Sequence, residues 1–299
     1  MMLSLCSEFW QIVLAQGFVV GIGTGCLFVP CVAITPQYLT TEMGAAMGAV
    51  ASGSALGGVI YPIILYRLIN QIGFPWAVRV IGFIALGTLF IPVSIMRLRM
   101  QPPKVRAMVD PTVQGPRLFV ILFYLSFFTE ATRITDSSLA FYMVSTFNAA
   151  SVFGRTILNK IPNKLADRFG RFNLLVPAAL SSGMLMVCMM TVHSKAAVIV
   201  MTILSGSMSG ALIGLPPMCL AILTADKSKL GTRVGMGYAI TALGVLASGP
   251  SSGAILRNGG ASLDWHSLCV CGGVPTCVSG LGYAAIRIFK YGLKLNIKA

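Results

Sequence analysis

The sequence predicts an all-α, polytopic membrane protein with about nine transmembrane helices. Of its 299 residues, 56% are hydrophobic and only 10% are charged, and the mean hydropathy is +0.84. These values exclude an ordinary soluble domain. The apolar residues form long continuous runs and not alternating segments of about ten residues, so helices are favoured over a β-barrel.

Apolar runs long enough to cross a bilayer are found on both sides of a basic, proline-containing stretch at 97–117. One further run, 118–128, supplies only about half of the apolar length that a span needs. We expect it to cross the membrane in a tilted or distorted form. The expected spans are 10–34, 44–68, 77–96, 118–128, 137–158, 174–193, 196–223, 234–256 and 266–289.

The basic residues indicate how the helices are oriented. The net charge is +14, and 16 of the 22 Lys and Arg residues lie in the stretches 97–117, 160–171, 227–233 and 287–298. Cytoplasmic loops of membrane proteins are enriched in Lys and Arg, so these four stretches are predicted to be cytoplasmic. Nine spans with an outside N-terminus satisfy this assignment. The membrane therefore explains the charge, and no nucleic-acid partner is expected.

Neither an enzymatic site nor a metal site is predicted. Most of the eight Cys residues lie in apolar runs and are expected to be unpaired small hydrophobic residues. The stretch 249–253 resembles a nucleophile turn, but the chain has only two His residues, His193 and His266, and neither has an evident acidic partner. The sequence also lacks a phosphate-binding loop. We therefore expect no catalytic residues, no cofactor and no metal.

A spaced set of Pro, Met-Gly, Pro and Trp occurs twice, which predicts an internal duplication, with chance agreement as the alternative. The intervals are 17, 15 and 14 residues in the first copy and 20, 14 and 15 in the second. Residues 1–98 are then a partial N-terminal half, 99–117 a cytoplasmic linker and 118–299 a six-helix C-terminal half. The repeated residues are Pro30, Met47, Pro62 and Trp76, and Pro216, Met236, Pro250 and Trp265.

A charged turn follows the span 137–158. Its residues Asp167, Arg168, Gly170 and Arg171 resemble the loop signature of the major facilitator superfamily, although Asn163 and Phe172 replace its first Gly and last Arg. The run 147–155 is similar to the fungal form of the monocarboxylate-transporter branch of this family. The resemblance implies a twelve-helix carrier, of which this chain lacks the first two helices and most of the third. It also implies that the four matching residues act as a conformational latch.

Arg155 is the main candidate for substrate binding. A charged group inside a membrane span is costly, and a guanidinium can bind a carboxylate through two parallel hydrogen bonds. Asn148 and Ser151 precede Arg155 by seven and four residues, which places all three on one helix face. The alternatives are that Arg155 extends to the cytoplasmic surface and that the other two bond to neighbouring helices. Ser151 stands where animal relatives have a proton-coupling Asp, so that route for protons is not expected.

The resemblance implies a secondary active transporter of a small organic anion, such as a monocarboxylate, that works by alternating access. Two alternatives remain open: an inactive, degenerate fragment of such a carrier, and an exporter of a larger secondary metabolite. The expected partners are the lipid bilayer and the organic anion, and protons stay an open question. We expect a multi-pass protein of the plasma membrane, with the vacuolar membrane as the alternative.

Overall fold

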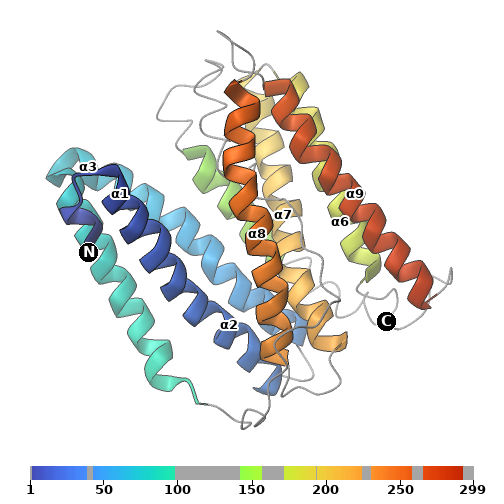
Figure 1. The fold of residues 1–299 in the computed structure, drawn as a ribbon, viewed down its shortest axis with the longest axis horizontal. Coiled ribbons are helices and arrows are strands. Elements are labelled where there is room, and N and C mark those ends of the chain that lie inside the picture. Colours follow the sequence, from blue (N-terminus) through green and yellow to red (C-terminus); the bar gives the residue numbers. More distant parts are fainter. Residues whose placement is uncertain are drawn as a thin grey trace.

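The computed structural model describes residues 2–38, 43–97, 142–156, 172–192, 194–223, 230–257 and 265–291. Across these ranges the chain is almost entirely helical and contains no strand, which confirms the predicted all-α class (Figure 1). Residues 142–156 form a helix that we call helix 142–156. The other elements are η1 (Met2–Leu5), α1 (Phe9–Ile12), η2 (Val13–Val19), α2 (Val20–Tyr38), α3 (Met43–Ile95), α6 (Phe172–Cys188), η3 (Met189–Thr191), α7 (Lys195–Leu223), α8 (Leu230–Arg257) and α9 (Trp265–Tyr291).

The long helices agree with the predicted spans. Within the described ranges, six helical elements are long and apolar enough to cross a membrane, with α3 counted as one. The first of them is continuous through α1, the π-helical stretch η2 and α2. The short run 118–128 and the linker 99–117 lie outside the described residues, so those two predictions stay predictions.

Element α3 is two helices joined by a sharp break. Gly73 has φ 77° and ψ 165°, a conformation that glycine adopts readily and other residues avoid. Pro75 follows it, and proline suits the first turn of a helix because its missing N–H would have no partner there. The two arms, 43–72 and 74–95, correspond to the predicted spans 44–68 and 77–96.

The helices form two groups (Figure 1). Elements η1, α1, η2, α2 and α3 make up the N-terminal group, and helix 142–156 with α6, α7, α8 and α9 makes up the C-terminal group. One contact between the groups is formed where α2 and the start of α3 pack against α8. There Val32 and Met47 are buried against Leu230 and Val234, and the rings of Phe28 and Tyr238 meet edge to face with centroids 5.0 Å apart.

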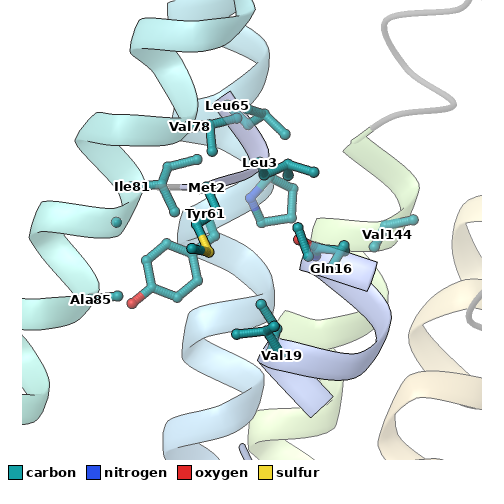
Figure 2. Close-up of a pocket in the computed structure, with 14 residues that line it drawn as sticks. Met2, Leu3, Gln16, Val19, Tyr61, Leu65, Val78, Ile81, Ala85 and Val144 are labelled. Atoms are coloured by element: carbon teal, nitrogen blue, oxygen red, sulfur yellow. The ribbon is translucent and has the colours of Figure 1, made fainter. Parts of the chain in front are cut away.

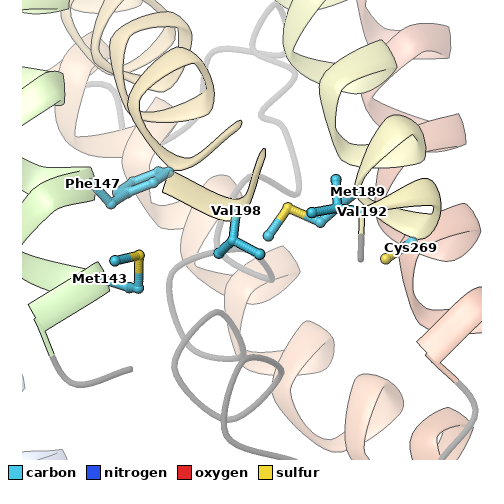
Figure 3. Packing of buried hydrophobic residues seen from close by; sticks show 6 residues of the cluster. All are labelled: Met143, Phe147, Met189, Val192, Val198 and Cys269. Carbon is cyan, nitrogen blue, oxygen red and sulfur yellow. The ribbon is translucent and has the colours of Figure 1, made fainter. Parts of the chain in front are cut away.

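The C-terminal group has a closely packed interior. Met143 and Phe147 of helix 142–156 are buried with Val198 of α7 in a cluster that extends to Cys269 of α9 (Figure 3). Helices α6 and α9 approach closely through glycine: a methyl group on Gly183 would lie 2.5 Å from the sulfur of Cys277. Small residues allow such close approach between helices in lipid, where dispersion contacts stabilise the pair.

Candidate functional site

The candidate site lies where the first arm of α3 meets helix 142–156. The two helices run antiparallel: contacts with successively later residues of helix 142–156 are made by successively earlier residues of α3. Tyr66 meets Tyr142 with ring centroids 5.8 Å apart. One to two turns further, the side chain of Asn148 lies over Gly58, and Arg155 then reaches Ala51 and Ser54. This helix pair joins the N-terminal group to the C-terminal group.

Arg155 is buried in this contact, with 5% of its surface exposed. Its Nη1 donates to the backbone carbonyl oxygen of Ala51 and to Ser54 Oγ, the latter at 2.5 Å. The Ser54 hydroxyl in turn donates to the same Ala51 carbonyl at 3.0 Å. The guanidinium is therefore turned toward α3 of the N-terminal group.

Two features leave the guanidinium only partly satisfied. Its Nε is buried and has no hydrogen-bond partner among the described residues. A buried donor without a partner costs roughly 1–3 kcal/mol. Glu8 is the one carboxylate-bearing residue in the part of the chain that the structure describes, and it lies before α1, far along the chain from Arg155. Within that part, neutral oxygens alone hold the positive charge.

Ser151 and Asn148 share the face of Arg155, as the spacing predicts. Ser151 is 1% exposed, and its hydroxyl has no partner within the described ranges. Asn148 donates from Nδ2 to the Val144 carbonyl of its own helix at 2.9 Å. A methyl group on Gly58 would lie 2.7–2.9 Å from the Asn148 amide atoms, so Asn148 packs directly on the α3 backbone. The structure thus places the three predicted residues on one helix, where Asn148 and Arg155 contact α3 and the Ser151 backbone packs on Gly210 of α7.

A second, neighbouring face of helix 142–156 packs against α7. A methyl group on Gly154 would overlap the backbone carbonyl of Ser207, and one on Gly210 would overlap that of Ser151. Gly206 packs in the same way on the carbonyl of Phe147. These backbone contacts hold Arg155 and Ser151 at a set height and rotation relative to the C-terminal group.

A cavity of about 830 Å³ lies beside the same helix pair (Figure 2). Val144, one turn before Asn148, lines it from helix 142–156, and Tyr61, Pro62 and Leu65 line it from α3. Gln16 and Tyr61 are the lining residues with polar side-chain groups. The remaining lining residues are Met2, Leu3, Ala15, Val19, Val20, Val78, Ile81, Gly82 and Ala85.

The structure describes some of the predicted site residues and not others. The proposed latch residues, Asp167, Arg168, Gly170 and Arg171, lie outside the described residues. The partners of Arg155 on α3 were not predicted, although the run of Ala, Ser and Gly from 51 to 58 signals a close helix contact. Among the residues described, no cluster of three or more His, Cys, Asp or Glu could hold a metal ion.

The comparisons with known proteins agree with one another. The Major Facilitator Superfamily model matches residues 1–154. The MFS-type transporter dbaD of Emericella nidulans is 50% identical over 295 residues, which cover 94% of this chain and 65% of that protein. The aspyridones efflux protein apdF of the same species is 33% identical over 279 residues, covering 88% of this chain and 56% of that protein.

The agnestins efflux protein AgnL12 of Paecilomyces divaricatus is also similar. It is 34% identical over 270 residues, which cover 85% of this chain and 61% of that protein. The chain therefore spans between 56% and 65% of the length of these three relatives.

Proposed function

We propose a transport function on the premise that this chain belongs to the Major Facilitator Superfamily, whose model matches more than half of it. The chain acts in a secondary carrier that moves an organic metabolite out of the cytoplasm by alternating access. The names of two relatives, which are efflux proteins for aspyridones and agnestins, support the outward direction. The six apolar helices place the chain in a membrane.

The observation that carries this proposal is the contact between the two helix groups. Alternating access needs two bodies that move against each other while each keeps its internal packing. Helix 142–156 is held in the C-terminal group by backbone contacts to α7. It meets α3 of the N-terminal group through side chains, among them the partly satisfied Arg155. This part of the boundary can open without disrupting the internal packing of either group.

The cavity supports a cargo larger and more apolar than a simple monocarboxylate. Its volume is about 830 Å³, and nearly all of its lining side chains are apolar. Pockets of this size and character hold drug-sized organic molecules. We therefore favour export of a larger metabolite over the transport of a small monocarboxylate that was the first expectation from the sequence.

Arg155 gives the proposal a finer part, which is a preference for cargo with an acidic group. The guanidinium has no carboxylate partner among the described residues near it, and its Nε is free to donate. The hydroxyl of Ser151, which has no hydrogen-bond partner among the described residues, lies one turn before Arg155 on the same helix. An acidic group that entered this contact could accept from both. Asn148 supplies a further amide beside them.

A further part of the proposed function concerns residues outside the described ranges. We propose that Asp167, Arg168, Gly170 and Arg171 form a latch at the cytoplasmic helix ends.

The plasma membrane is the proposed location, and the vacuolar membrane is the alternative. A fluorescent fusion in a fungal host distinguishes the two membranes. Labelling of a cysteine at position 229 from outside intact cells would contradict the predicted orientation.

The test of function is an efflux assay in yeast cells that express the chain. Cells are loaded with 2-naphthoic acid, with its amide or with lactate, and loss of each compound is followed over time. We expect faster loss of the naphthoic acid than in cells with an empty vector, and little change for lactate. Equal handling of the acid and its amide would argue against carboxylate recognition. No efflux above the vector would favour the inactive-fragment alternative.

A substitution at Arg155 separates cargo binding from insertion into the membrane. Arg155→Lys keeps the charge but loses the planar fork, so the half-saturating concentration for the acid should rise about tenfold. The rate at which the cells lose the naphthoic amide should not change. Arg257→Lys is the matched control, because Arg257 is exposed at the end of α8. An unchanged affinity with Arg155→Lys, at normal membrane levels, would remove Arg155 from the cargo site.

A further inference from the structure

We propose that Ser54 and the Ala51 carbonyl form a reversible tether for Arg155 that holds the two helix groups together in this conformation. The inference rests on the proposed alternating access, because a tether has a function only if the groups move apart. It gives Ser54 a role that its sequence position does not suggest. Ser54 acts through Arg155 and is a positioning residue.

The tether links segments that are distant in the chain. Arg155 and Ser54 are 101 positions apart, and Arg155 and Ala51 are 104 apart. The three groups form a closed arrangement, because Arg155 Nη1 donates to both oxygens and the Ser54 hydroxyl donates to the Ala51 carbonyl. Because the Ser54 hydroxyl donates its proton to the Ala51 carbonyl, it accepts the hydrogen bond from the guanidinium through a lone pair of Oγ.

The chemistry of the contact suits a bond that must break in each transport cycle. A buried carboxylate partner would hold the guanidinium strongly, and separating such a pair is very unfavourable. The acceptors here are a hydroxyl and a backbone carbonyl that already belongs to a helix. Arg155 Nε has no partner among the described residues, so the tethered state does not satisfy the guanidinium fully. Opening the contact gives this donor access to water or cargo.

The neighbouring serine provides a matched control. The hydroxyl of Ser52 donates to the Ala49 carbonyl of its own helix at 2.7 Å, and no contact to Arg155 is formed by it in the described structure. Ser54 is itself exposed at the edge of the contact, so replacing it leaves no buried void. Ser54→Ala and Ser52→Ala therefore remove the same atom from the same helix, and only one of the two changes the tether.

The experiment measures the distance between the groups in the purified chain in lipid nanodiscs. Ketone-bearing amino acids at Met96 and Ile288 carry spin labels and leave the native cysteines unchanged. Both side chains are exposed, and the ends of α3 and α9 lie on the same side of the bundle (Figure 1). Pulsed electron resonance then gives the populations of the tethered and separated states.

We expect Ser54→Ala to lower the ratio of tethered to separated molecules about tenfold, the scale of one hydrogen bond to a charged group. Ser54→Thr keeps the hydroxyl and should restore the ratio, whereas Ser52→Ala should leave it at the parent value. If Ser54→Ala and Ser52→Ala give the same distance distribution, the tether proposal is wrong. The measurement needs no cargo, so an absence of efflux would contradict the proposed function and leave the tether standing.

Discussion

The two faces of helix 142–156 are packed in opposite ways. Toward α7, Gly154 and Gly210 bring backbone against backbone, and no methyl group could be added without overlap. Toward α3, the contact is made by the long side chains of Asn148 and Arg155, with one buried donor left without a partner in the described residues. The same helix is thus held by rigid backbone packing on one face, whereas on the other face, called the exchangeable face, its polar contacts can exchange partners.

This difference indicates which surfaces move. Close backbone packing loses all of its dispersion contacts at once when helices separate, because each contact depends on near-touching atoms. A polar contact between side chains can exchange its partner for water or for a cargo atom. Helix 142–156 should therefore move with the C-terminal group, and it should slide along α3 or separate from it.

The largest effect is expected at the fixed face. Gly154→Ala places a methyl group against the backbone carbonyl of Ser207, which no side-chain rotation can relieve. Overpacking of this kind should lower the free energy of unfolding by about 3 kcal/mol. Denaturation of the purified chain in mixed micelles, followed by circular dichroism, measures the change.

Gly244→Ala is the control for that experiment. Gly244 lies in α8 of the same group, and a methyl group there meets no atom within 4 Å. It should stabilise the helix slightly, by about 0.5–1 kcal/mol, because alanine loses less backbone entropy than glycine. If Gly154→Ala were as well tolerated as Gly244→Ala, the rigid attachment of helix 142–156 to α7 would be refuted.

A smaller effect is expected at the exchangeable face. Gly58→Ala brings a methyl group to 2.7–2.9 Å from the amide atoms of Asn148. Because these atoms are at the end of a side chain that can rotate, the cost should be about 1 kcal/mol. Adding Asn148→Ala removes the clash and should recover most of that loss, which a double-mutant cycle in the same denaturation assay measures. Additive losses in the cycle would mean that the two residues do not meet.

The sequence was sufficient to predict the helices and the face of Arg155. Long apolar runs set the spans, and the break between the spans 44–68 and 77–96 is realised at Gly73. The spacing of Asn148, Ser151 and Arg155 fixes a common face because helix geometry depends only on local periodicity. These features could be predicted because each arises from residues near one another in the chain.

The partners of that face could not be predicted. A helical pattern gives the direction of a side chain but not the helix that it meets, and Ser54 lies 101 positions from Arg155. The cavity draws its lining from η1, η2, α2, α3 and helix 142–156, so it depends on tertiary packing throughout. The Gly206 and Gly210 pair does carry a visible signal, since two glycines four residues apart are typical of close helix contacts in membranes.

The most direct test of the account compares distances between the groups with distances within one group. Spin labels at Met96 and Ile288 span the two groups, whereas labels at Met184 and Ile288 both lie in the C-terminal group, on α6 and α9. All three side chains are exposed. We expect two populations for the first pair and one narrow population for the second. A single narrow distance for both pairs, or equal broadening of both, would contradict movement of the groups along the α3 contact.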